Sequence, residues 1–215
     1  VIPSSIPDKF ATLIEPMTIV VSDLIVRSKF IKGETLAVIG AGQIAQLAVV
    51  AAKAAGASQI IVIGQQIDSV RRFKSARALG ADYTFNVEKD DIYSEVMRIT
   101  KDKGVEMIFE ASGSEQGINS AIDIVGLCGR MSLLGLSKKE CICVDWDKMM
   151  KKMVNLQFNM SSDYTEIGRA IEIFSNPPCD LSPLISHESS IDDWENIFNE
   201  LALGNGIKAV LTFDQ

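Results

Sequence analysis

The chain has 215 residues, a formal net charge of −7 at pH 7 and a pI near 4.8. This length suits one large domain, or one domain with pieces of another. The acidic balance argues against nucleic acid and anionic membranes as partners, and no signal peptide or membrane span is visible. The four cysteines form no C-x-x-C pair and no regular framework, which favours unpaired thiols in the cytoplasm.

The first part of the chain predicts two helices ahead of a buried strand. One helix covers Lys9–Ile14, Glu15-Pro16 is expected to end it, and a second helix covers Met17–Phe30. Lys32-Gly33-Glu34 predicts the turn that leads into the strand.

A glycine turn follows that strand. Residues 35–55 read TLAVIGAGQIAQLAVVAAKAA, an apolar run, then Gly40-Ala41-Gly42, then a helical pattern. This order is typical of dinucleotide-binding folds, with Ala45 at the third position of G-x-G-x-x-G. The glycines let a pyrophosphate approach the main chain, where the start of the helix faces the anion. Such turns also occur without a ligand. The predicted pyrophosphate-binding residues are Gly40, Gly42, Gln43 and Ile44.

Further strands and helices alternate along the chain. Apolar strand candidates begin about 22 to 25 residues apart, near Thr35, Ile60, Tyr83, Val105, Arg130 and Asn155. One strand and one helix in each interval predict a six-stranded, doubly wound parallel sheet of the Rossmann type, with its ligand crevice at the carboxyl ends of the strands. The expected helices are Ile44–Ala55, Ser69–Leu79, Ile92–Thr100, Gln116–Val125, Asp147–Met153 and Thr165–Phe174.

Two later stretches do not continue this alternation. After Asn176-Pro177-Pro178, the helix expected at Ile191–Leu203 and the strand at Lys208–Phe213 read as pieces that pack on something else. Cys141–Asp145 is rich in β-forming residues, and we interpret it as an edge strand that pairs across a dimer. The sequence therefore predicts a homo-oligomer.

The end of the second strand bears on the choice of cofactor. NAD-dependent enzymes of this fold place Asp or Glu there to bind the adenosine ribose, but this chain has Gly64. Without that charge a 2′-phosphate is not repelled, and Arg71 or Arg72 could pair with it, which favours NADP. Asp68, in the same long loop, could instead serve NAD. The two arginines could also be solvated charges of a helix face.

The segments KGETLAVIGAGQIAQLAVVAAKAAGASQIIVI, RFKSARALGAD, GVEMIFEASGS, GRMSLLGL and LISH resemble the cofactor-binding half of the zinc-dependent medium-chain dehydrogenases, in the alcohol, sorbitol and threonine branch. The resemblance implies hydride transfer between NAD(P) and a small alcohol or polyol, with zinc in a GroES-like catalytic domain. It also implies a division into a lead-in from the catalytic domain (1–33), a dinucleotide-binding domain (34–180) and a tail that returns to the catalytic domain (181–215).

The resemblance implies further site residues. Glu15 matches the family's L-x-E-P stretch beside the zinc, although from the residues alone it reads as a helix-end carboxylate before proline. Ser112, Gly135 and Leu136 would line the ribose side of the cofactor. Ser112 could equally belong to a helix cap.

His187 is the single histidine, so the chain cannot build a zinc site alone, and we predict no catalytic residue in it. The chain alone is expected to bind dinucleotide without turnover. The alternatives are a zinc-free quinone-reductase-type enzyme or a non-enzymatic nucleotide-binding domain, with an S-adenosylmethionine-dependent methyltransferase a distant third.

Overall fold

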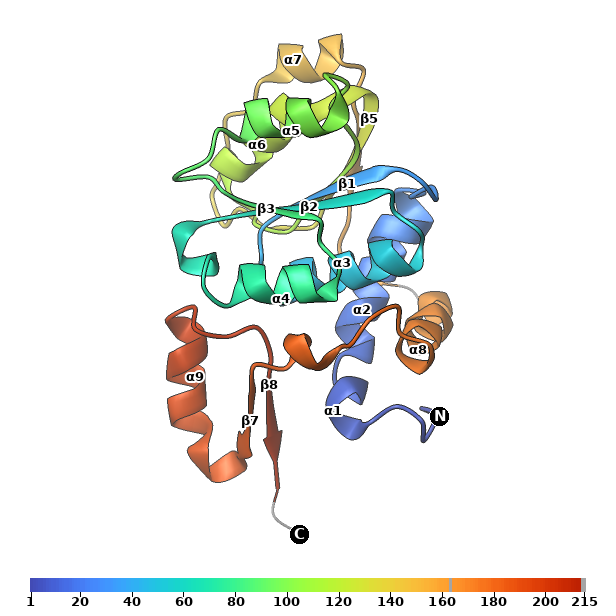
Figure 1. The fold of residues 1–215 in the computed structure, drawn as a ribbon, viewed down its shortest axis with the longest axis vertical. Coiled ribbons are helices and arrows are strands. Elements are labelled where there is room, and N and C mark those ends of the chain that lie inside the picture. Colours follow the sequence, from blue (N-terminus) through green and yellow to red (C-terminus); the bar gives the residue numbers. More distant parts are fainter. Residues whose placement is uncertain (163, 214–215) are drawn as a thin grey trace.

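The computed structural model describes residues 1–162 and 164–213, in which six strands form one parallel sheet in the order β3-β2-β1-β4-β5-β6 (Figure 1). The order reverses between β1 and β4, as in a doubly wound fold. The predicted fold class is confirmed. The strands of this sheet are β1 (Thr35–Ile39), β2 (Gln59–Gly64), β3 (Tyr83–Asn86), β4 (Val105–Glu110), β5 (Val125–Leu133) and β6 (Asn155–Phe158).

Helices cover both faces of the sheet, which lies between them in Figure 1. One face packs on α2 (Ile14–Val20), α3 (Gln43–Ala54), α4 (Arg72–Leu79) and α8 (Ile167–Ser175). The other packs on α5 (Ile92–Thr100), α6 (Glu115–Ile124) and α7 (Trp146–Lys151). A short helix, α1 (Asp8–Ala11), precedes α2.

The central strand β1 explains why this sheet forms. All five of its residues are buried, with Leu36 and Val38 in one apolar cluster and Ala37 and Ile39 in the other. Because successive side chains of a strand point to opposite faces, an unbroken apolar run suits a strand covered on both sides.

The lead-in differs from the prediction at Pro16. Glu15-Pro16 does not end a helix, because both residues lie in the first turn of α2. A proline is tolerated there, since the N–H that it lacks would have no acceptor within the helix. The chain then continues as a π-helix, Val21–Arg27, rather than as the second α-helix that was expected.

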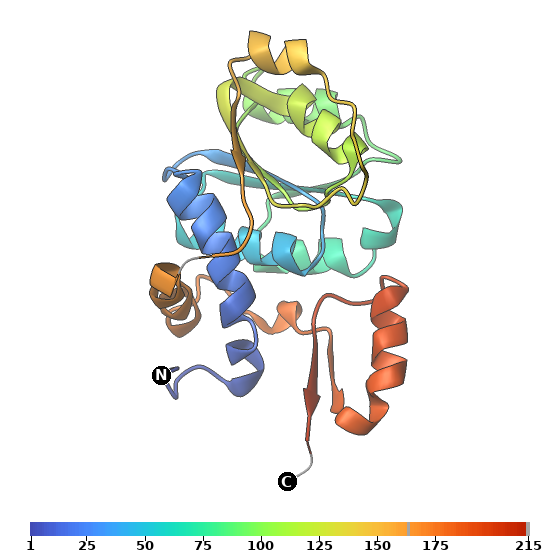
Figure 2. The same cartoon turned by 180° about the vertical axis from the view of Figure 1, so that it is seen from behind.

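The last part of the chain stands apart from the large sheet. The strands β7 (His187–Ser190) and β8 (Ala209–Thr212) form a separate parallel pair, and α9 (Trp194–Ala202) packs beside them (Figure 2). Short 3₁₀ turns occupy Gln66–Asp68, Tyr164–Glu166, Ser182–Leu184 and Ile191–Asp193. Cys141–Asp145, expected as an edge strand, has no regular secondary structure in this single chain. In the described ranges no helix has both the length and the apolar character needed to cross a bilayer.

Candidate functional site

The glycine turn joins β1 to the start of α3. Gly40 has φ +106°, a left-handed conformation that favours glycine, and a Cβ there would lie 3.4 Å from the backbone of Ala111. Gly42 is the N-cap of α3, and among the described residues no side chain caps this helix. A Cβ built on Gly42 would have no atom within 4 Å. The turn therefore presents open space in front of N–H groups that have no side-chain acceptor, as an anion requires.

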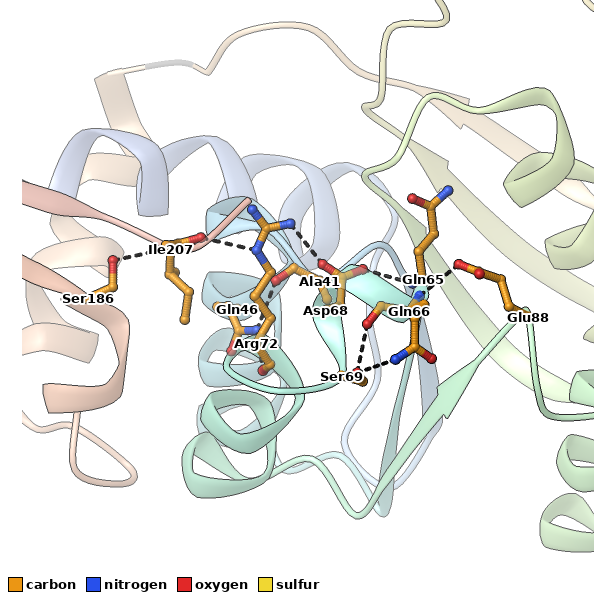
Figure 3. Close-up of polar contacts among 11 residues, drawn as sticks. Ala41, Gln46, Gln65, Gln66, Asp68, Ser69, Arg72, Glu88, Ser186 and Ile207 are labelled. Atoms are coloured by element: carbon orange, nitrogen blue, oxygen red, sulfur yellow. Dashed lines mark hydrogen bonds and ion pairs between the residues drawn. The ribbon is translucent and has the colours of Figure 1, made fainter. Parts of the chain in front are cut away.

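Gln46 holds this turn in place and was missed by the sequence reasoning. Its side chain is fully buried and donates from Nε2 to the carbonyl oxygens of Ala41 and Arg72, each at 3.0 Å (Figure 3). Gln46 thus ties the glycine turn to the start of α4. The available signal was a glutamine in the apolar run Ile44–Ala52 of the helix.

Asp68 occupies the space beside Gly64 at the end of β2. A Cβ on Gly64 would lie 2.7 Å from Oδ2 of Asp68, whose residue is only 5% exposed. The carboxylate accepts the N–H of Gln65 at 2.8 Å and pairs with Nη1 of Arg72 at 2.8 Å (Figure 3). The Asp68 carboxylate therefore occupies the position that a side chain of residue 64, at the end of β2, would otherwise fill.

Both candidate arginines are held by the tail. Arg72 donates from Nε to the carbonyl oxygen of Gly206 at 3.1 Å, in addition to its pair with Asp68. Arg71 donates from Nη1 to the carbonyl oxygen of Ser186 at 3.2 Å. A 3₁₀ turn that contains Asp68 precedes α4, and α4 therefore begins at Arg72 and not at Ser69 as predicted.

Glu110, at the end of β4, was also missed. It is fully buried, and its carboxylate accepts hydrogen bonds from the N–H groups of Ser112 (2.9 Å) and Gly113 (3.0 Å) and from the Ser112 hydroxyl. Gly113 has φ +65° and lies against Gly135 and Leu136. The loops after β4 and β5 therefore meet at the edge of the crevice.

A cavity of about 310 Å³ brings several predicted residues together. It opens at the carboxyl ends of β1, β2 and β4, where a doubly wound fold binds its ligand. Gln43, Ile44 and Arg71 are not among its lining residues, and Gly135 and Leu136 line a separate, mostly apolar cavity of about 510 Å³. The predicted residues that line the first cavity are Gly40, Gly42, Gly64, Asp68, Arg72 and Ser112.

The described part of the chain has no group of three or more His, Cys, Asp or Glu residues able to hold a metal ion. Glu15 lies exposed in the first turn of α2, and His187 makes a contact of 2.9 Å between Nδ1 and Oγ of Ser186. Zinc sites in proteins use three or four such ligands, so zinc does not fit these residues alone.

Comparison with known proteins identifies the family. The family model described as zinc-binding dehydrogenase matches residues 44–176. The chain belongs to the zinc-binding dehydrogenase family. Family membership confirms the resemblance inferred from the sequence. The matched region begins in the first turn of α3 and includes β2 to β6. It contains Gly64, Asp68, Arg72 and Ser112 of the cavity lining, whereas β1 and the glycine turn precede it.

The chain is 26% identical over 211 residues to the sorbitol dehydrogenase of Halalkalibacterium halodurans, and 30% identical over 217 residues to the L-threonine 3-dehydrogenase of Pyrococcus horikoshii. These matches cover 98% and 97% of the chain but 61% and 59% of the relatives. Its fold resembles that of the alcohol dehydrogenase TADH from Thermus sp. ATN1, with a TM-score of 0.90, 20% identity, and coverage of 99% of this chain and 62% of the other.

Proposed function

We propose that this chain is the cofactor-binding half of a dehydrogenase that transfers hydride between a nicotinamide dinucleotide and a small alcohol or polyol. The open space at Gly42, in front of the first turn of α3, carries the proposal: no atom lies within 4 Å of a Cβ built there, so a pyrophosphate would meet bare main chain. The N–H groups of Gln43 and Ile44 would bind the phosphates. The nicotinamide ring, when bound, accepts or releases the hydride.

A fluorescence titration of the 215-residue chain with NADH tests this function. We expect enhanced emission from bound NADH, and displacement by ADP, which carries the same adenosine and pyrophosphate. An unchanged NADH signal together with no ADP binding by calorimetry would contradict it. Neither the quinone-reductase-type alternative nor the non-enzymatic one is favoured, because the relatives are sorbitol and threonine dehydrogenases.

Residues 1–33 and 181–215 belong, in this proposal, with a catalytic domain, and 34–180 form the dinucleotide-binding domain. The support is the exposed apolar face of α9, where Trp194 and Phe198 pack edge to face at 5.7 Å and are 47% and 58% exposed. Glu15 would lie near the zinc only together with ligands of that domain. The chain alone is therefore expected not to oxidise alcohols, and zinc-dependent turnover by it would refute this division.

We further propose NAD as the cofactor, although the sequence favoured NADP. The NADP hypothesis needs Arg71 or Arg72 to pair with a 2′-phosphate. Arg71 donates to a carbonyl oxygen of the tail, and Arg72, although it lines the cavity, is already held by Asp68 and by the carbonyl oxygen of Gly206. The carboxylate of Asp68 lines the cavity and would accept hydrogen bonds from the ribose hydroxyls while repelling a phosphate.

Asp68→Asn is expected to weaken NADH binding about tenfold, because an amide oxygen accepts hydrogen bonds from the ribose hydroxyls less strongly than a carboxylate does. The affinities for NADH and NADPH should become similar, because the neutral amide does not repel the 2′-phosphate. Competing titrations with the two cofactors measure this ratio. Glu88→Gln is the matched control, since Glu88 is exposed and accepts the N–H of Gln66 at 2.8 Å in the same loop. Wild-type preference for NADPH would contradict the proposal.

A second copy of the chain is the proposed partner. Within the described sheet, β6 pairs with β5 and leaves its other edge free. Phe158, Trp146 and Leu136 are exposed around the 510 Å³ cavity beside that edge. Phe158→Lys is expected to yield monomers in sedimentation analysis.

The cytoplasm is the proposed location, because the four free thiols fit a reducing compartment.

A further inference from the structure

Glu110 is a fully buried carboxylate without a paired cation among the described residues. Burying such a charge is costly unless hydrogen bonds compensate for lost water. The compensation here comes from one loop: the N–H and hydroxyl of Ser112, and the N–H of Gly113, which lies within 3.0 and 3.2 Å of the two carboxylate oxygens. These hydrogen bonds fix the loop that follows β4 against the end of the strand.

The same residue also joins this loop to the one after β5. The backbone oxygen of Glu110 accepts the N–H groups of Leu134 (3.0 Å) and Gly135 (3.2 Å). A Cβ on Gly135 would lie 2.1 Å from the nitrogen of Gly113 and 2.7 Å from Oε2 of Glu110. The two loops therefore touch through bare main chain, with the carboxylate packed against their contact.

We infer that Glu110 is a positioning residue for the nicotinamide half of the cofactor, because it locks the loops after β4 and β5 together. This inference rests on the proposed function. With adenosine at the end of β2 and pyrophosphate at the end of β1, the order of the sheet takes the remainder of the cofactor over β4 and β5. Ser112 and Leu136, on the two locked loops, stand on that side.

Glu110→Gln tests the inference without changing the size of the side chain. Gly113 lies close to both carboxylate oxygens, so either orientation of the amide points its NH₂ group at that N–H. We expect the dissociation constant of NADH to rise about tenfold, since an NH₂ group then stands 3.0 or 3.2 Å from the N–H of Gly113, where the wild type has an acceptor. The affinity for ADP, which lacks the nicotinamide riboside, is expected to stay at the wild-type value.

Glu106→Gln is the matched control, because Glu106 lies exposed near the opposite end of β4. It should leave both affinities unchanged. Equal weakening of NADH and ADP by Glu110→Gln, or no change in either, would overturn the positioning role. If wild type binds neither ligand, the proposed function itself fails. If Glu110→Gln does not fold, Ser112→Ala removes one donor and should show the same selective loss of NADH, about threefold; equal effects on both ligands would overturn the inference.

Discussion

Gly42→Val is expected to abolish measurable NADH binding while the chain stays folded. Gly42 has φ −71° and no atom within 4 Å of a built Cβ, so a Cβ added there meets neither left-handed strain nor a neighbouring atom in the ligand-free protein. The valine would instead fill the space that the pyrophosphate needs. Loss of two or more charge-assisted hydrogen bonds to the phosphates costs about 3 kcal/mol or more, a hundredfold or more in affinity.

Gly168→Val supplies the matched control. Gly168 lies in the first turn of α8, has no atom within 4 Å of a built Cβ, and does not line the cavity. Both variants should melt close to the wild type in thermal denaturation, and only Gly42→Val should lose NADH in fluorescence titration. Retained NADH affinity in folded Gly42→Val would show that the cofactor does not lie against this turn.

The alternation of strands and helices was predictable because it depends on local patterns. Leu36–Ile39 is apolar at each position, and the glycine turn follows directly, so β1 and α3 lie where the sequence placed them. Pro16 misled the prediction because its effect depends on its position within the helix. In the first turn it costs no hydrogen bond, whereas in the middle of a helix it would.

The candidate site was predictable only where its residues are neighbours in sequence. Gly40 and Gly42 belong to one motif, but the arginines on α4 are held by carbonyl groups of Ser186 and Gly206, more than a hundred residues away. No local pattern predicts those contacts, which decide whether an arginine can reach a phosphate. Glu110 was missed for a related reason. It is the last residue of a buried strand, and its hydrogen bonds form only after the loops that follow β4 and β5 have folded against it.

Asp23→Asn is expected to stabilise the folded chain by about 4 kcal/mol at pH 8. Asp23 lies in the π-helix, is fully buried, and has no hydrogen-bond partner for either carboxylate oxygen among the described residues. Burial raises the pKa of this carboxyl from 3.8 to about 7, and the charge of Arg27 offsets only part of the shift. Asparagine keeps the shape of the side chain and carries no charge to desolvate.

The pH dependence follows from the direction of that pKa shift. Between pH 4 and pH 7 the folded chain keeps a proton on Asp23 that the unfolded chain releases, so the free energy of unfolding falls as pH rises. A difference of about three pKa units corresponds to about 4 kcal/mol, present in full above pH 7 and absent below pH 4. The two proteins should therefore be equally stable in acid and diverge toward neutral pH.

Urea unfolding of wild type and Asp23→Asn at a series of pH values measures this divergence. Asp147→Asn, at an exposed position of α7, should follow the wild-type curve at each pH, which separates burial from the loss of a carboxylate as such. If the free energies of unfolding of wild type and Asp23→Asn stay parallel from pH 4 to pH 8, the Asp23 carboxylate is solvated or hydrogen-bonded in the folded chain, and the prediction is wrong. Divergence of the two curves toward neutral pH would show that the charge of the buried Asp23 carboxylate limits the stability of the π-helix between the lead-in and the sheet.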